Sequence, residues 1–179
     1  MLNKEKTALV VVDIQGKLAQ LVYEHEKLFN NVKKTIKGAR ILGLPIIWLE
    51  QNPDGLGPTV PDIAEELNGI EPLAKMTFSC AKHKPFLKKL KDTGCVQVLI
   101  VGIETHICVY QTAMELFDLG YEVEIVADAV SSRTLENKNI ALQKMRDTGI
   151  KLSSVEMCLY ELQEVAEGDV FKQILKLIK

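Results

Sequence analysis

The sequence predicts an open α/β sandwich, a parallel sheet with helices on both faces, and two observations favour it. Short apolar runs rich in β-branched residues recur along the 179-residue chain, and segments with helical spacing of apolar residues separate them. Buried strands that alternate with helices require a parallel sheet with right-handed crossovers. The length and the 47% of hydrophobic residues suit one core, so we expect residues 1–179 to form a single domain.

The first half of the chain alternates between these two kinds of segment. Strands are indicated by apolar runs without polar alternation, and helices by apolar residues three and four apart that stop at Gly or Pro. A long loop rich in Pro and Gly interrupts the pattern, and such a loop invites a functional role. In order, we expect a strand at 7–13 (TALVVVD), a helix at 27–42, a strand at 46–50 (IIWLE), the loop at 51–61, a short helix at 62–67, a weak strand at 72–76 and a helix at 85–92.

The second half repeats the alternation. One helix there places Cys108, Thr112 and Leu116 on a common face before Gly120 ends it. In order, we expect a strand at 96–102 (VQVLIVG), a helix through 108–117, a strand at 121–128 (YEVEIVAD), a helix from 135 to 148, a strand at 150–153, and helices at 155–165 and 170–178.

Several polar groups follow predicted strands directly. Open α/β sheets bind ligands beyond the carboxyl ends of their strands, near the point where the strand order reverses. Asp13, Glu50, the turn at 102–108 and Asp128 all lie at such predicted ends. We therefore expect a site at that edge of the sheet.

Cys108 is the candidate nucleophile. It lies in the first turn of a predicted helix, where unpaired N–H groups and the helix dipole favour a thiolate. A buried cysteine is also a common small apolar filler, and the residues alone leave both interpretations open. For Cys80, Cys95 and Cys158, which lack this placement, we expect the filler role.

Asp13 and Lys75 could complete a catalytic group. The Asp13 carboxylate at the end of an apolar strand needs a partner, although an Asp with a purely structural role would explain this position as well. Lys75 lies in EPLAKMTFSC and could instead be a surface lysine whose aliphatic stem is buried. If they converge with Cys108, the carboxylate can take the thiol proton and the ammonium can offset the negative charge. Backbone N–H groups of GIETHIC could then stabilise an oxyanion.

Composition and motifs exclude several other functions. The net charge of −2, with Lys and Arg scattered among acids, argues against a nucleic-acid partner, and no apolar run is long enough to span a membrane. The four cysteines lack C-x-x-C spacing, and the start of the chain lacks a signal-peptide pattern, so we expect free thiols and a cytoplasmic protein. The three histidines lack metal-ligand spacing, and no phosphate-binding motif occurs. We therefore expect no metal and no cofactor.

Taken together, the segments VVVDIQ, KMTFSC and GIETHICVYQTAMELFDLGYEVEIVADAVSSR resemble the isochorismatase-like cysteine hydrolases, in the same order along nearly the whole chain. GARILGLPIIWLEQNPDGLG resembles the subgroup of isochorismatase domain-containing proteins. The resemblance implies a sheet of order 3-2-1-4-5-6, a triad of Asp13, Lys75 and Cys108, and a cis peptide at Ile103–Glu104. It also implies an oxyanion hole formed by the N–H groups of Glu104 and Cys108, and a homo-oligomer.

The sequence departs from two branches of that family. Its segment EQNPDGLG lacks the metal-binding D-x-H of the nicotinamidases, and Cys108 is present where the siderophore-pathway isochorismatases lack a cysteine. His106 stands where the family usually has Asp.

We therefore expect a hydrolase of a small amide or related C–N acyl substrate, with a thioester on Cys108. Gln51, Asn52, Phe78 and His106 are the expected pocket residues, although loop or core packing would also explain them. The alternative is a non-catalytic scaffold that retains the triad for ligand binding or redox sensing.

Overall fold

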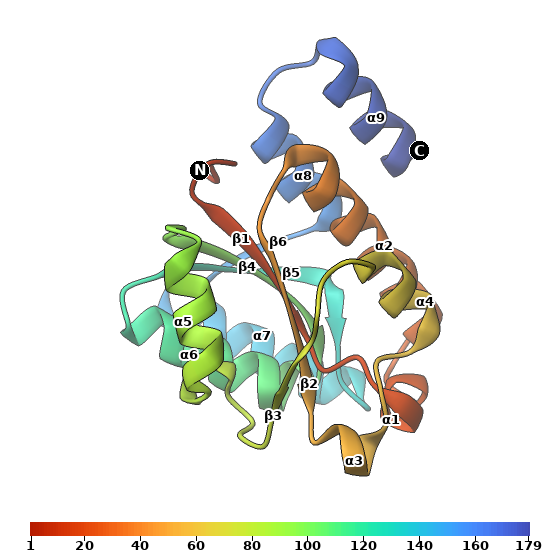
Figure 1. The fold of residues 1–179 in the computed structure, drawn as a ribbon, viewed down its shortest axis with the longest axis vertical. Coiled ribbons are helices and arrows are strands. Elements are labelled where there is room, and N and C mark those ends of the chain that lie inside the picture. The colour runs from red at the N-terminus through yellow and green to blue at the C-terminus, as the bar shows by residue number, and fades with distance from the viewer.

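Six parallel strands form one sheet in the order β3-β2-β1-β4-β5-β6 in the computed structural model, which describes residues 1–179 (Figure 1). This is the order that the family resemblance implied, so the predicted fold class is confirmed. The strands are β1 (Thr7–Val12), β2 (Ile46–Gln51), β3 (Leu73–Lys75), β4 (Gln97–Ile103), β5 (Glu122–Ser131) and β6 (Lys151–Ser153).

Helices cover both faces of the sheet (Figure 1), and the sheet separates two apolar cores. Alternate residues of β1 point to opposite faces: Leu9 and Val11 pack under α2 and α8, whereas Val10 and Val12 pack under α5, α6 and α7. The α-helices are α1 (Gly16–Leu21), α2 (His25–Leu42), α3 (Pro53–Leu56), α4 (Pro61–Ala64), α5 (Lys84–Asp92), α6 (Tyr110–Asp118), α7 (Leu135–Thr148), α8 (Val155–Gln163) and α9 (Gly168–Ile178). Single turns form η1 (Glu65–Leu67), η2 (Cys80–Lys82) and the π-helical η3 (Thr105–Val109). None of these helices has the length and apolar character needed to cross a bilayer.

The topology places the candidate site at the switch point of the sheet. β1 pairs with β2 on one side and with β4 on the other, so the strand order reverses between β1 and β4. Asp13 follows β1 and Glu104 follows β4, so the segments that the sequence singled out leave the same edge side by side.

The structure differs from the sequence-based prediction in two respects. The helices α1 and α3 were not expected, because six and four residues are too few to show a helical period. Asp128 does not end a strand, because β5 continues to Ser131. The pairing with β4 jumps from Ile125 to Val130, so the residues between them form a bulge that contains Asp128. Its carboxylate accepts a hydrogen bond from the N–H of Val155 at 2.9 Å instead of facing the candidate site.

Candidate active site

Asp13 and Lys75 form a buried ion pair at the end of the central strands. The chain turns sharply after β1, where Asp13 has a positive φ of 52°, and β3 brings Lys75 beside it. Lys75 Nζ lies 2.6 Å from Asp13 Oδ2, and both residues are almost completely buried. Two charges held at this distance away from water satisfy each other, whereas either one alone would be costly.

The Lys75 ammonium has further acceptors that fix its position. It donates to Gln51 Oε1 at 2.9 Å, and it lies 3.1 Å from the carbonyl oxygen of Thr77 and 3.2 Å from that of Phe78. These oxygens, together with Asp13, leave the lysine no freedom to swing out to solvent. Its charge therefore stays inside the site.

Cys108 lies against this ion pair, in the π-helical turn η3, with 7% of its surface exposed. Burial raises the pKa of the Cys108 thiol, the negative charge of Asp13 raises it further, and the charge of Lys75 opposes both. The expectation of a resting thiolate is therefore wrong. The helix start alone does not ionise a thiol that is buried beside a carboxylate.

One oxygen of the Asp13 carboxylate has no hydrogen-bond partner. Burial raises the pKa of its carboxyl group, whereas the positive charge of Lys75, the hydrogen bond from Lys75 and the close contact with the Cys108 thiol lower it. Oδ2 is engaged by Lys75, whereas the buried Oδ1 has no hydrogen-bond partner. Because buried polar atoms are normally paired, this oxygen is available to a further hydrogen-bond donor.

The turn between β4 and α6 supplies the opposite wall of the site. The Ile103–Glu104 peptide bond is cis, at the position the resemblance implied, and the N–H of Glu104 makes no hydrogen bond within the protein. The Glu104 carboxylate is anchored outward by Arg133 Nε at 3.0 Å. The side-chain anchor leaves the backbone N–H of Glu104 available to a ligand.

The predicted pocket residues have different surroundings. Gln51 is buried and holds Lys75, and its amide nitrogen donates to the carbonyl oxygen of Met76 at 3.1 Å. Asn52 begins α3, and its backbone N–H donates to the carbonyl oxygen of Lys75 at 2.9 Å. Phe78 is exposed, and His106 Nδ1 lies 2.9 Å from Ser132 Oγ. All four adjoin the segments that carry Asp13, Lys75 and Cys108.

Sequence reasoning missed two polar residues of the site. Gln15 is buried after β1; its Nε2 donates to the carbonyl oxygens of Gln51 and Gly57, and its Oε1 accepts from the N–H of Gln51. Thr105 is buried in η3, and its hydroxyl, like Asp13 Oδ1, has no hydrogen-bond partner. Both residues stand in the quoted segments VVVDIQ and GIETHIC, but contacts of this kind depend on side-chain orientation.

No group of three or more His, Cys, Asp or Glu side chains is arranged to hold a metal ion.

An open parallel sheet with polar side chains at its switch point is the arrangement of an α/β enzyme. The chain belongs to the isochorismatase family, because the model of the isochorismatase domain matches residues 7–157. Isochorismatase domain-containing protein 2 of Danio rerio is 36% identical over 179 residues, which cover 99% of this chain and 89% of that protein. The protein of the same name in Homo sapiens is 37% identical and covers 97% of this chain and 83% of its own length.

Solved structures share the fold over the whole chain. The MAR1 ribonuclease of Caenorhabditis elegans has a TM-score of 0.90 and 35% identity, and the match covers 99% of this chain and 91% of that one. The YcaC gene product of Escherichia coli, an octameric hydrolase of unknown specificity, has a TM-score of 0.93 and 27% identity, covering 99% and 88%. YcaC from Pseudomonas aeruginosa, solved with hexane-2,5-diol and covalent acrylamide, has a TM-score of 0.92 and 27% identity, covering 98% and 90%. The chain thus has the fold of an isochorismatase-family hydrolase.

Proposed function

We propose that this protein is a cysteine hydrolase that cleaves a small amide or a related C–N acyl bond, with a triad of Asp13, Lys75 and Cys108. The observation that carries the proposal is that the Asp13 carboxylate lies close to the Cys108 thiol and has one oxygen, Oδ1, without a hydrogen-bond partner, while Lys75 holds the other oxygen at 2.6 Å. A thiol whose pKa is raised needs a base at the moment of attack, and this oxygen is the base at hand.

The first half of the reaction would release the amine. Asp13 Oδ1 takes the thiol proton while the Cys108 sulfur attacks the carbonyl carbon, and the carbon–oxygen electron pair moves onto oxygen. The N–H groups of Glu104 and Cys108 hold this oxyanion. The intermediate collapses to a thioester as the C–N bond breaks and Asp13 returns the proton to the leaving nitrogen.

The second half would consume one water molecule. Asp13 takes a proton from the water, whose oxygen attacks the thioester carbonyl, and the carboxylic acid leaves as the C–S bond breaks. The proton on Asp13 returns to the sulfur and restores the resting thiol. The positive charge of Lys75 offsets the negative charge that passes between sulfur and carboxylate.

The related structures support this reading at two points. The E. coli relative is a hydrolase, and the P. aeruginosa relative carries covalently bound acrylamide, which a nucleophile attacks at its vinyl carbon, so that relative has a reactive nucleophile. By analogy, we place the reactive group of this chain at Cys108.

The test is release of ammonia or amine from a panel of small amides. The wild-type protein and Cys108→Ala should be compared on each compound, and intact-mass spectrometry should detect the acyl-enzyme on the wild type alone. Equal turnover by both proteins would remove Cys108 from the mechanism.

A non-catalytic scaffold is the alternative, in which Cys108 binds a ligand or is oxidised by peroxide to a sulfenic acid with release of water. The raised pKa of the thiol weakens this reading, since oxidation needs the thiolate. A compound that stabilises the protein and is recovered unchanged, with no amide in the panel hydrolysed, would favour the scaffold.

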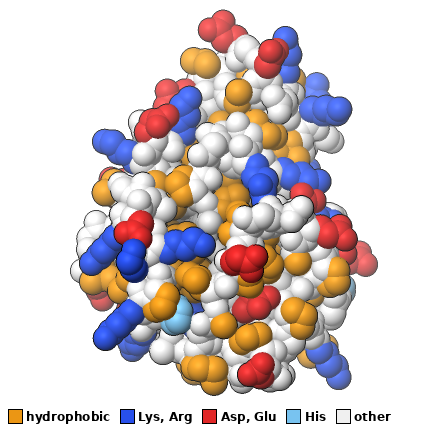
Figure 2. All heavy atoms as spheres, in the orientation of Figure 1, with side chains coloured by type: hydrophobic (Ala, Val, Ile, Leu, Met, Phe, Trp, Pro, Cys, Tyr) orange, Lys and Arg blue, Asp and Glu red, His pale blue; other side chains and the backbone are white.

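RNA cleavage is a second candidate, because the C. elegans relative is named a ribonuclease. Acidic and basic side chains are interspersed over the face shown in Figure 2, without a block of positive charge to follow a phosphate backbone. Degradation of a labelled RNA by wild type that is lost in Cys108→Ala would favour this candidate over amide hydrolysis.

A further inference from the structure

The Lys75 ammonium is held by one charged acceptor and three neutral ones. Asp13 Oδ2 lies 2.6 Å from its nitrogen, and the Gln51 side-chain oxygen lies at 2.9 Å. The carbonyl oxygens of Thr77 and Phe78 follow at 3.1 and 3.2 Å. An ammonium has three protons to donate, so three neutral acceptors can satisfy it without Asp13.

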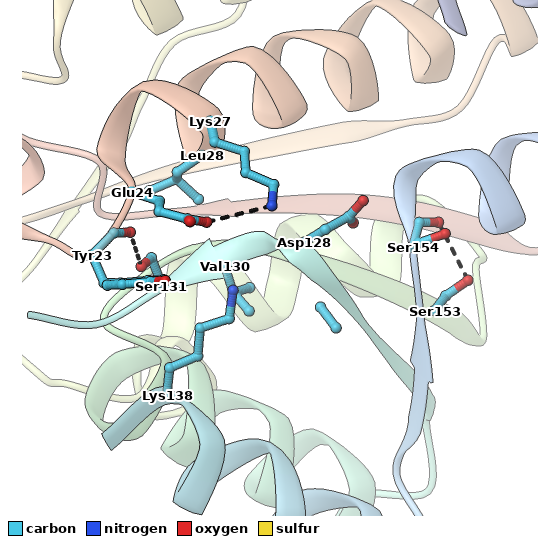
Figure 3. Close-up of a pocket in the computed structure, with 11 residues that line it drawn as sticks. Tyr23, Glu24, Lys27, Leu28, Asp128, Val130, Ser131, Lys138, Ser153 and Ser154 are labelled. Atoms are coloured by element: carbon cyan, nitrogen blue, oxygen red, sulfur yellow. Dashed lines mark hydrogen bonds and ion pairs between the residues drawn. The ribbon is translucent and has the colours of Figure 1, made fainter. Parts of the chain in front are cut away.

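The charges of the pocket beside the β5 bulge provide a contrast (Figure 3). Two lysines, Lys27 and Lys138, and two carboxylates, Glu24 and Asp128, line that pocket, so its charges are balanced. None of these groups changes its charge in the proposed reaction. The Lys75 pair differs, because its carboxylate accepts a proton in each half of the reaction.

Protonation of Asp13 weakens the ion pair at the moment when the Lys75 charge is needed. The carboxylate becomes neutral as it takes the thiol proton, and the negative charge then lies on the Cys108 sulfur. A nearby positive charge favours this thiolate, provided that the ammonium does not move away. Some group other than Asp13 must therefore keep Lys75 in place.

Gln51 presents its oxygen to Lys75 because its nitrogen is engaged elsewhere. Nε2 donates to the carbonyl oxygen of Met76 at 3.1 Å. Reversing the amide would place its N–H groups against the ammonium and its oxygen against this carbonyl, and neither contact is favourable. The side chain is buried, so water cannot replace these partners.

Gln15 fixes the backbone of Gln51. β1 ends at Val12, which pairs with Leu49, so Gln51 lies two residues beyond the last pair of β1 and β2. The side-chain amide of Gln15 takes the place of the missing strand: its oxygen accepts from the Gln51 N–H at 2.6 Å, and its nitrogen donates to the Gln51 carbonyl oxygen at 3.0 Å. Without Gln15, these buried backbone groups would lose their partner on this side.

We propose that Gln51 is a positioning residue, which keeps the Lys75 ammonium beside Cys108 while Asp13 carries the thiol proton, and that Gln15 holds Gln51 in the required place. This inference rests on the proposed function, because that reaction is what protonates Asp13. A neutral acceptor suits the role, since a carboxylate at this position would add a second negative charge beside the thiolate.

The first test measures how firmly Lys75 is held when Asp13 is neutral. Asp13→Asn removes the charge, and Gln51→Met removes the amide oxygen but keeps the length of the side chain. Acetylation of Lys75 by acetic anhydride, mapped by peptide mass spectrometry, should be roughly tenfold faster or more in Asp13→Asn/Gln51→Met than in either single variant. Asp13→Asn/Gln143→Met is the matched control, because Gln143 is exposed on α7, and it should react like Asp13→Asn.

Two results of this test would overturn the proposal. Lys75 that is no more reactive in Asp13→Asn/Gln51→Met than in Asp13→Asn would show that Gln51 does not hold it. Cys158 is fully buried in the opposite core, so its alkylation reports opening of the whole fold. Acetylation of Lys75 that rises only together with alkylation of Cys158 would assign Gln51 a purely structural role.

The second test measures the effect on Cys108. Alkylation of Cys108 by iodoacetamide should be roughly tenfold slower in Gln51→Met than in wild type, and unchanged in Gln143→Met. Equal rates in Gln51→Met and wild type would contradict the proposal. Neither test requires turnover: if the wild type hydrolyses no amide, the proposed hydrolase activity fails, but the two labelling rates still decide the role of Gln51.

Discussion

At the scale of single residues, the site depends on how one carboxylate divides its two oxygens. Oδ2 of Asp13 pairs with Lys75, and the buried Oδ1 has no hydrogen-bond partner; in the proposed reaction Oδ1 takes the thiol proton. The sequence indicated that these three side chains could meet, because each lies in a segment that ends or follows a strand. It could not indicate that the thiol rests protonated, since burial and the charge of Asp13 depend on distances in the folded chain.

Lys75→Met should destabilise the protein because it leaves the Asp13 carboxylate buried without a counter-ion. We expect a loss of about 3–5 kcal/mol in the free energy of unfolding at neutral pH, measured by urea denaturation. The loss should shrink as the pH falls, since the variant raises the pKa of Asp13 and protonation removes the unpaired charge. The double variant Asp13→Asn/Lys75→Met should recover part of the loss; a double variant less stable than Lys75→Met would contradict the pairing.

At the scale of elements, β1 and β4 must approach closely for their ends to form one site. Gly102 pairs with Val12 in the sheet, has a φ of +121°, and would drive any Cβ into the backbone of Val12. The apolar runs predicted β1, β2 and β4 within one or two residues, because β-branched residues without polar alternation indicate buried strands. The bulge in β5 was not predictable, since the apolar sequence continues past Asp128 and the pairing register depends on β4.

Gly102→Ala should be strongly destabilising, by about 3 kcal/mol or more, because it combines a disfavoured φ with a backbone clash. Gly120→Ala is the matched control: Gly120 has a φ of +87°, but a Cβ there would meet no atom. We expect the control to lose only about 1–2 kcal/mol. Thermal and urea unfolding of both variants measure the difference, and equal losses would show that the close approach of β1 and β4 has no energetic weight.

At the scale of the whole molecule, four buried thiols lie in or beside the two apolar cores. Burial raises the pKa of both Cys80 and Cys158 from 9.0 to about 12. The folded state therefore keeps these protons above pH 9, whereas the unfolded chain releases them. Unfolding then becomes more favourable as the pH rises.

The free energy of unfolding should accordingly fall above about pH 9, with each of these two thiols contributing at most ~1.4 kcal/mol per pH unit. Urea denaturation at pH 8, 9 and 10 measures the slope. Cys80→Ala/Cys158→Ala lowers stability at every pH by creating cavities, but it should flatten this slope. An unchanged slope in the double variant would assign the alkaline loss to other groups.

The assembly state also belongs to this scale. Ile174 and Ile178 of α9 pack on the core, whereas Phe171 and Leu175 remain half-buried at the surface. The homo-oligomer that the family resemblance implies stays a prediction; the E. coli relative with this fold is an octamer. Light scattering should give a mass that is a multiple of 20.0 kDa, and a strictly monomeric mass would contradict this expectation.

The proposed mechanism requires Asp13 to act as a base toward Cys108, and the rate of Cys108 alkylation by iodoacetamide tests this directly. Labelling relative to Cys80 and Cys158 is uninformative, because both are fully buried, so Asp13→Asn is the control. If Asp13 takes the thiol proton, the variant should label roughly 100-fold more slowly at pH 7. The wild-type rate should also fall on acidification at a pH above 3.8, since burial raises the pKa of Asp13. Equal or faster labelling of Asp13→Asn would contradict the account, because the carboxylate would then only repel the thiolate.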